Sequence, residues 1–273
     1  MQITVIGGLI FGFVCIIISI LLNGDIGGFI DPASIFIVVG GVIASTLVAY
    51  PISDVKRIPK LMKMAMSKTD IDVYKDIDKI VELSETARKE GLLALENSTE
   101  GMDDPFLKNG VMLILDGSDP ELVKNVMETE LSFMADRHSN GVAILNFMSS
   151  ASPAFGMIGT LIGLINMLAT LSEMDTLGTS MAVALVTTFY GCVLANLIFT
   201  PLARQLSLKS EQEQLRKSII IEGILSIQDG ENPRVIRDKL MAFVSRSSAA
   251  TQKKAGRKQN PLPEGNEGGE ANG

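Results

Sequence analysis

Four long stretches of uncharged, mostly apolar residues divide the chain. Asp, Glu, Lys and Arg are all absent from 1–24, 32–53, 139–172 and 176–203. Each stretch holds about 20 residues or more, the length that a helix needs to cross a hydrocarbon core of about 30 Å. The pattern therefore predicts four membrane-spanning helices, near 3–22, 34–51, 147–170 and 180–200.

Between the second and third predicted spans, apolar residues recur at helical spacing. Ile77, Ile80, Val81 and Ala87 share one face, and charged residues occupy the other. Gly91 then breaks this pattern. Further along, "DDPFLKNGVMLIL" offers an Asp as N-cap and a proline at the first helical position, so a second helix is expected there.

A short motif occurs twice and predicts two corners. "DGSDPELV" (116–123) and "DGENPRVI" (229–236) both place a glycine after one helix and a capping residue and proline before the next. The capping residues are Asp119 and Asn232. A helix that begins near Pro120 meets no breaker before Gly141 and Pro153, so we expect it to run into the third span. The helix of the fourth span is likewise expected to continue to the second corner.

The distribution of basic residues gives the orientation. The 273 residues carry a formal net charge of −7, yet all 24 Lys and Arg lie within 56–137 and 204–258. Cytoplasmic loops are enriched in Lys and Arg, so both termini and the segment 52–146 are expected in the cytoplasm. A cleavable secretory signal is disfavoured because the first basic residue is Lys56, which leaves no basic region before the first apolar stretch.

The expected fold class is all-α, a polytopic membrane protein with four transmembrane helices and a helical cytoplasmic domain. Its predicted parts are a transmembrane hairpin (1–51), a helical cytoplasmic domain (52–146), a second transmembrane hairpin (147–200), a cytoplasmic helical extension (201–245) and a disordered tail (246–273). The tail is rich in Gly, Pro, Lys and Glu and has almost no large apolar residues.

Motifs for enzymatic chemistry are absent from the sequence. It has no Gly-rich phosphate loop, no nucleophile elbow and no Cys/His spacing for a metal. Cys15 and Cys192 fall in different predicted spans, where they are expected to pack as small apolar side chains. His138, the one histidine, stands beside Arg137, and a solvated histidine near the membrane surface is favoured over a catalytic base. We therefore expect no enzyme, no cofactor and no fixed metal site.

Small and polar residues form one face of the third span and one face of the fourth. They are Ser149, Ser152, Pro153, Gly156, Gly159, Thr160, Gly163 and Asn166, and then Ala184, Thr187, Thr188, Gly191, Ala195 and Asn196. Such faces let membrane helices approach closely, and packing alone is one interpretation. The other is a polar path, because Pro153 frees the carbonyl of Ser149 and the threonine hydroxyls can replace water around an ion.

The missing charges bear on that second interpretation. A path for H⁺ or Na⁺ through a bilayer normally uses an ionisable group within it, and no predicted span has one. If this chain conducts ions, the carboxylate has to come from another chain packed against these faces. The sequence thus indicates an obligate membrane complex.

Several motifs together resemble the MotA/PomA family of bacterial flagellar motor stators, over roughly residues 1–245. They are "ETARKEGLLALE" (85–96), "SPAFGMIGTLIGLINML" (152–168), "AVALVTTFYG" (182–191) and "IQDGENPRVI" (227–236). The resemblance implies a multi-pass protein of the bacterial cytoplasmic (inner) membrane. A ring of such subunits, a pentamer, would surround a MotB/PomB-type single-span partner that supplies the ion-binding Asp. Ion flow would turn into torque on the rotor protein FliG.

The resemblance also assigns residues. Arg88 and Glu96, with Lys89 beside them, would meet the rotor, and the acidic side is thinner than usual because "NST" follows Glu96. Pro153 and Pro201 match the two functional prolines of the family.

Thr160 and Thr188, with Thr187 adjacent, match the ion-path threonines of the MotA/PomA family, near which Na⁺ would bind transiently. "GMIGTLIGL" and Asp31, at the outer mouth, favour Na⁺ over H⁺. An ExbB/TolQ-type energiser of outer-membrane processes is the alternative, although that family has three spans and lacks "ARKEGLLALE". A solute transporter would require repeat symmetry that the two hairpins do not show.

Overall fold

The structure, a computed structural model, describes residues 3–24, 26–68, 72–99, 101–171 and 174–244. Within these ranges the chain forms helices and turns with no strand, which confirms the all-α prediction. The expected disordered tail, 246–273, lies outside the described residues. Contacts divide the described residues into two compact units, unit 1 within 1–71 and 132–214 and unit 2 within 72–131 and 215–244.

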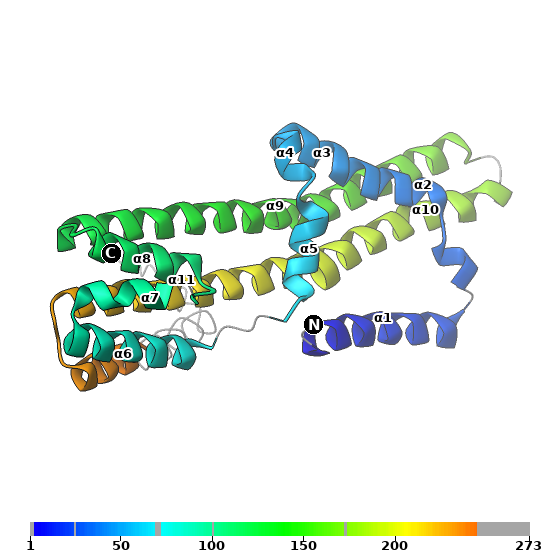
Figure 1. Ribbon diagram of the computed structural model, residues 1–273. Coiled ribbons are helices and arrows are strands. Elements are labelled where there is room, and N and C mark those ends of the chain that lie inside the picture. The colour runs from blue at the N-terminus through cyan, green and yellow to red at the C-terminus, as the bar shows by residue number, and fades with distance from the viewer. Residues whose placement is uncertain (1–2, 25, 69–71, 100, 172–173, 245–273) are drawn as a thin grey trace, which may run out of the picture. The chain divides into compact units, whose positions relative to one another are not determined.

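Unit 1 contains the predicted spans (Figure 1). The first is α1 (Ile3–Asn23), and the second runs from α2 (Pro32–Ile35) through a π-helical segment, Phe36–Gly40, into α3 (Gly41–Ala49). Four helices of the described chain are long and apolar enough to cross a membrane: Thr4–Leu22, Ile26–Ala49, Pro120–Ala169 and Leu177–Gln228. The chain is therefore a multi-pass membrane protein.

The third and fourth spans are parts of much longer helices. The third belongs to α9 (Pro120–Ala169), which has 50 residues. The fourth begins with α10 (Met174–Val193) and continues through the π-helical segment Leu194–Phe199 into α11 (Thr200–Gln228). Both expected continuations are thus present. Two of the predicted domain limits, after 146 and after 200, fall inside these helices because nothing in the sequence there ends a helix.

Two short helices follow the second span. They are α4 (Ile52–Val55) and α5 (Ile58–Met66). α5 is amphipathic: Ile58 and Ala65 are buried, whereas Lys60 and Lys63 are exposed. Its apolar face belongs to a cluster that includes residues of α9 and α11, and α5 runs across α9 (Figure 1).

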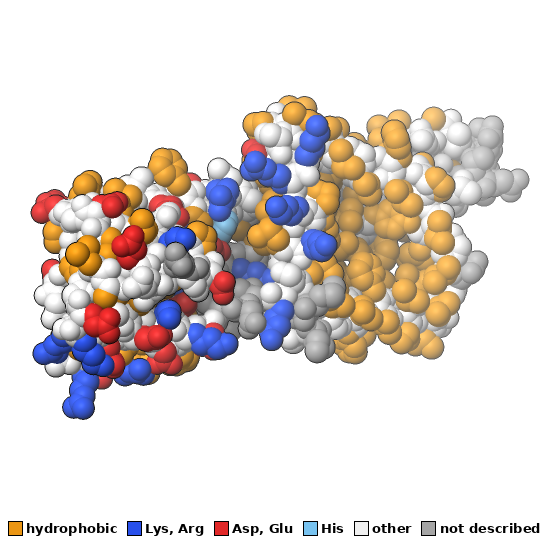
Figure 2. All heavy atoms as spheres, viewed as in Figure 1, with side chains coloured by type: hydrophobic (Ala, Val, Ile, Leu, Met, Phe, Trp, Pro, Cys, Tyr) orange, Lys and Arg blue, Asp and Glu red, His pale blue; other side chains and the backbone are white. Residues whose placement is uncertain are grey.

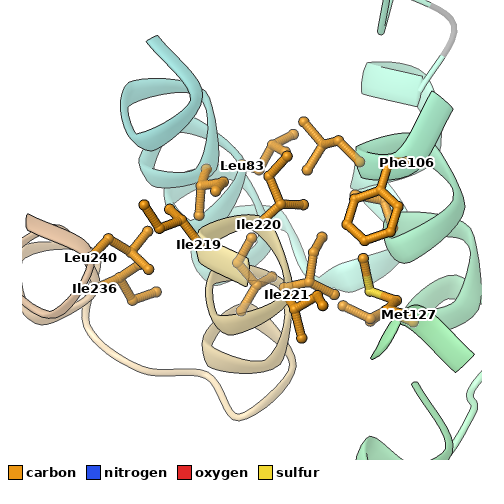
Figure 3. Packing of buried hydrophobic residues seen from close by; sticks show 14 of the residues in the cluster. Leu83, Phe106, Met127, Ile219, Ile220, Ile221, Ile236 and Leu240 are labelled. Atoms are coloured by element: carbon orange, nitrogen blue, oxygen red, sulfur yellow. The ribbon is translucent and has the colours of Figure 1, made fainter. Parts of the chain in front are cut away.

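Unit 2 is a helical domain with a large apolar core. It contains α6 (Val73–Glu90), a 3₁₀ turn at Leu92–Ala94, α7 (Leu95–Thr99), α8 (Pro105–Leu115) and a helix over 233–244, packed on the flanking parts of α9 and α11. Figure 3 shows Ile220 and Ile221 of α11 between Phe106 on one side and the 233–244 helix on the other. Ile220 is fully buried. Burial of each such side chain contributes about 1.5–3 kcal/mol.

The corners form as predicted. Gly91, Gly117 and Gly230 adopt φ values of 87°, 72° and 69°, which only glycine adopts without strain. Asp119 and Asn232 accept hydrogen bonds from the backbone N–H groups two residues later, at 2.9 and 3.0 Å. These are N-caps, so the repeated motif builds the same turn twice.

Ion pairs cross the core of unit 2. Arg216 of α11 donates to both carboxylate oxygens of Asp76 at 2.5 and 2.8 Å. Its Nη2 also lies 2.5 Å from Asp104, the N-cap of α8, in an ion pair that is not well aligned as a hydrogen bond. The hydrogen bond to Asp76 raises the pKa of Arg216. One guanidinium thus joins three helices.

Candidate functional site

Glycines bring α9 and α10 close together. A Cβ placed on Gly191 would lie 2.6 Å from the carbonyl oxygen of Ser152 and 3.2 Å from the Cα of Pro153. Gly156 and Gly163 face the backbone of α10 in the same way, with nearest backbone atoms at 3.1 and 2.8 Å. Because the opposing atoms are backbone, no side-chain movement could make room. The packing interpretation of the small-residue faces is therefore correct for the glycines.

Two hydroxyls meet across this contact. The Oγ1 atoms of Thr160 and Thr188 lie 2.5 Å apart. Thr160 Oγ1 is also 2.9 Å from the carbonyl oxygen of Ala184 and 3.1 Å from that of Gly156. Both threonines are half-buried, so their oxygens lie at the edge of the helix pair. The structure thus brings together the two residues that the sequence singled out for the ion path.

Thr187 lies on the inside of the same contact. It is fully buried, and its hydroxyl is 2.9 Å from the carbonyl oxygen of Ala184 and 3.0 Å from that of Val183. Its side chain fills the space left by Gly159, where a Cβ would lie 2.5 Å from Thr187 Cγ2. The geometry gives Thr187 a packing role, and its place in an ion path stays a prediction.

Asp31 caps the second span. Its Oδ2 accepts hydrogen bonds from the backbone N–H and the hydroxyl of Ser34, at 2.7 and 2.5 Å. Ser34 is fully buried and lies 3.5 Å from the carbonyl oxygen of Val183, the same atom that Thr187 approaches. A chain of oxygens therefore connects Asp31 to the threonines of α10. The predicted place of Asp31 at an ion entrance is not tested by this arrangement.

A second hydroxyl pair connects the helix turns next to the two predicted functional prolines, Pro153 and Pro201. Ser149 stands one turn before Pro153, and its Oγ lies 2.7 Å from that of Thr200, the residue before Pro201. Ser149 Oγ also donates to the carbonyl oxygen of Ala195 at 3.3 Å. Ser149 was predicted on the polar face of the third span, whereas Thr200 was not among the predicted residues. The signal available was a threonine next to Pro201.

The π-helical segment Leu194–Phe199 contains one buried and one exposed residue of the predicted polar face. Ala195 is buried as expected, but Asn196, predicted to share its face, is exposed and donates to the carbonyl oxygen of Cys192 at 3.1 Å. Asn166 of α9 is exposed too. π-helical turns often occur at functional sites. Asn196 in this turn and Asn166 of α9 thus place two carboxamides on the surface of the membrane-spanning part.

Taken together, the α9–α10 pair offers oxygens without charge. Hydroxyls and helix carbonyls can solvate a small cation, and a cation in hydrocarbon also requires a counter-charge. No Asp or Glu occurs in 139–172 or 176–203. In the described residues no three metal-binding side chains cluster. These oxygens alone lack the counter-charge of an ion site, so in an ion path the carboxylate would have to come from outside these helices.

The predicted rotor-facing residues lie on unit 2. Arg88 and Lys89 lie in the last turn of α6, and Glu96 lies in the first turn of α7, after the turn at Gly91. All three side chains are exposed. Lys89 pairs with Glu85 at 3.3 Å, while neither Arg88 nor Glu96 has an ion pair among the described residues. Leu93, which stands between Lys89 and Glu96 in the sequence, is 76% exposed and was not among the predicted contact residues.

One family model and two named relatives match most or a large part of this chain. Residues 98–219 match the model of the MotA/TolQ/ExbB proton channel family. Motility protein A of Borreliella burgdorferi is 42% identical over 86% of this chain and 90% of its own length. Chemotaxis protein PomA of Vibrio alginolyticus is 38% identical over 92% of this chain and 99% of its own.

A solved structure is also similar. The flagellar MotAB stator complex from Bacillus subtilis matches with a TM-score of 0.83 and 33% identity, over 90% of this chain and 97% of that chain. The similarity extends over the spans and unit 2 together. It is thus a likeness of nearly the whole chain rather than of one motif.

Proposed function

Since the chain belongs to the MotA/TolQ/ExbB proton channel family, we propose that it is a stator subunit of the bacterial flagellar motor and that its α9–α10 pair lines an ion path. The observation that carries the proposal is the contact between Thr160 and Thr188 at the edge of two helices without charged residues. Ion flow through this path would drive torque on the rotor. The subunit acts as part of a channel, and no enzymatic step is proposed.

The missing carboxylate indicates the partner. A MotB/PomB-type single-span subunit would supply an ion-binding Asp opposite the hydroxyls. The similarity to a MotAB stator complex supports such a partner and an oligomer of this chain. We propose a pentameric ring around the partner, with both termini and unit 2 on the cytoplasmic side of the inner membrane. All basic residues flank the spans on one side, which supports that orientation.

The prolines would couple the ion path to movement. Pro153 and Pro201 lack the N–H that an uninterrupted helix uses, and the Ser149–Thr200 hydroxyl pair connects their two turns. Loading of the path by a cation would alter the hydrogen bonding of these hydroxyls. A change at the path would thereby reach both helices that continue into unit 2.

Unit 2 would contact the rotor protein FliG. Arg88, Lys89 and Glu96 provide exposed charges of both signs, and Leu93 provides an apolar side chain between them. Complementary charges steer association, and a central apolar contact adds affinity. The Arg88→Glu and Glu96→Lys substitutions should each impair swimming without lowering the amount of protein in the membrane.

We propose Na⁺ as the coupling ion, with H⁺ as the alternative. The oxygens around Thr160 suit a partly dehydrated Na⁺, and Asp31 lies on a chain of oxygens leading to them. Swimming speed should rise with external Na⁺. A speed that ignores Na⁺ but falls to zero with a protonophore would contradict the sodium assignment.

Deletion of the gene tests the proposal as a whole. Flagellated but paralysed cells, restored by the intact gene, are expected if the chain is a stator subunit. An ExbB/TolQ-type energiser would instead give swimming cells with defects at the outer membrane. The deletion should be made in a strain without a second stator system, so that normal swimming would overturn the proposal.

A further inference from the structure

A large cleft in unit 1 lies apart from the hydroxyl site. It has a volume of about 980 Å³ and is formed by α4, α5, the part of α9 that precedes the third span and the part of α11 that follows the fourth. This volume is at the upper end of the range of about 300–1,000 Å³ typical of ligand pockets. Neither the ion path nor the proposed rotor contact uses it.

The rim of the cleft is basic. Arg57, Lys60, Lys68, Arg137 and Lys209 line it, against three carboxylates, Asp54, Asp136 and Glu213. Arg57 and Asp54 are 3.9 Å apart and largely exposed, a weak pair. Lys60, Lys68 and Arg137 form no ion pair with any residue that the structure describes. The excess of positive charge is thus available to an anion.

The floor of the cleft is apolar. Leu61, Ile144 and Leu206 line it, and all three belong to the apolar cluster of unit 1. The exposed apolar residues Phe133 and Met64 complete its walls, with relative exposures of 72% and 42%. A free inorganic anion gains nothing from such a floor. An amphiphile with an acidic head and an apolar body fits both parts.

The position of the cleft agrees with this chemistry. Figure 2 shows Lys and Arg side chains gathered beside the broad hydrophobic surface of the spans. Arg57 follows the end of α3 by only eight residues, and α5 has the pattern of a helix that lies in a membrane interface. Basic pockets at the cytoplasmic ends of membrane helices commonly bind acidic lipid headgroups.

Lys209 shapes the cleft from within. Its Nζ donates to the carbonyl oxygens of Met64 and Ser67 at 2.6 and 2.5 Å and thereby holds the end of α5. Burial lowers the pKa of Lys209, and no carboxylate in the described residues pairs with it. A bound phosphate would compensate this desolvated charge.

From these observations we propose that the cleft binds an anionic phospholipid of the cytoplasmic leaflet. Its phosphate would lie among Arg57, Lys60 and Arg137, and its apolar part along Leu61, Ile144 and Leu206. Such a lipid would fix α5 against α9 at the membrane edge. The proposal goes beyond the stator function and does not depend on it.

The test compares two charge-matched variants of the full chain, extracted from bacterial membranes together with its bound partners. One carries Arg57→Gln, Lys60→Gln and Arg137→Gln. The control carries Lys108→Gln, Lys124→Gln and Arg234→Gln, three exposed positions of unit 2. Phosphatidylglycerol and phosphatidylethanolamine retained per chain are measured by mass spectrometry. At least a fivefold loss of phosphatidylglycerol is expected in the cleft variant and little change in the control.

Three further arms make the result decisive. Arg57→Lys, Lys60→Arg and Arg137→Lys keep the charge and should keep the lipid, which separates a charge effect from misfolding. Excess inorganic phosphate should not displace the lipid; displacement would identify a site for soluble anions and overturn the proposal. Equal retention in the cleft and control variants would overturn it too, as would cross-linking of a second copy of the chain into the cleft.

Discussion

The membrane contact of α9 with α10 and the core of unit 2 are held together in opposite ways. In unit 2, large side chains such as Ile220 and Phe106 fill the space between helices, and ion pairs such as Arg216–Asp76 join them. Between α9 and α10 the backbones approach at glycines, and hydroxyls replace ion pairs. Apolar burial drives the first arrangement in water but gives no advantage in lipid, where close contact and hydrogen bonds take its place.

That difference also separates stability from function. A contact between backbones in close approach leaves no room for large side chains, so polar atoms remain near the surface of the pair. In unit 2 the isoleucine-rich core is closed to solvent, and the charged side chains lie on the surface. The first arrangement suits an ion path, and the second suits a rigid body that contacts another protein. The following changes test this contrast.

Removal of volume should damage unit 2 most. Ile220→Ala leaves a cavity beside Leu83 and should lower the free energy of unfolding of the unit by about 2–5 kcal/mol. Hydrogen exchange of α6 and α8 amides in the purified full chain should then accelerate by about 30-fold or more. Val235→Ala, at a residue that is 54% exposed, is the control and should change exchange little.

Addition of volume should damage the membrane contact. Gly191→Ala forces a methyl group against the carbonyl oxygen of Ser152 and should cost about 1–3 kcal/mol of helix packing. The variant should assemble poorly with its partner and swim slowly. Gly110→Ala in unit 2 is the matched control, because the nearest atom to its Cβ is the flexible end of Met127 at 2.7 Å. Equal damage from both substitutions would contradict the contrast.

Arg216→Gln should weaken unit 2 by an intermediate amount. It leaves Asp76 and Asp104, which are 15% and 19% exposed, without their cation, and should cost about 1–3 kcal/mol. Arg237→Gln removes a comparable Arg–Asp pair that is exposed, with Asp78 at 2.8 Å, and should cost less than about 0.5 kcal/mol. Thermal unfolding of the two variants decides whether burial of the pair sets the size of the effect.

The smallest expected effect depends on pH. Hydrogen bonds to Glu222 and then Glu231 raise the pKa of Lys239 above its ordinary value of 10.5. The contribution of Lys239 to stability is therefore complete below pH 10.5 and lost as the pH rises through the raised value. The difference in thermal midpoint between the protein and Lys239→Gln should shrink toward zero above that pH. A difference that is constant across the range would show that Lys239 acts by packing alone.

Much of the fold could be predicted from local signals. The uncharged stretches gave four spans, and the repeated Gly–Asp/Asn–Pro motif gave two corners with the expected caps at Asp119 and Asn232. Spacing placed Thr160 and Thr188 each on a helix face with glycines that permit close approach, and the structure brings their hydroxyls together. These features depend on short stretches of chain and on helical periodicity.

The remaining features depend on interactions that spacing does not encode. Asn196 was predicted on the face of Ala195, but successive helix residues point about 100° apart, so Asn196 is exposed while Ala195 is buried. The Ser149–Thr200 pair required that two long helices be in register. The N-cap formed by Asp31 could have been predicted from the sequence, because Asp31–Pro32 repeats the Asp104–Pro105 pattern that predicted the start of α8.

Ion flux through vesicles that contain the chain with its MotB/PomB-type partner tests the ion path most directly. Thr160→Val and Thr188→Val keep the volume of the side chain and remove the hydroxyl, whereas Thr160→Ser keeps the hydroxyl. An interaction between a polar group and a charged group contributes about 1.5–3 kcal/mol, and each Val variant loses the one between the hydroxyl and the ion. Each Val variant should therefore lower Na⁺ flux about tenfold or more while the complex stays assembled. The Ser variant should retain most of the flux. Undiminished flux in the double Val variant would contradict an ion path along Thr160 and Thr188.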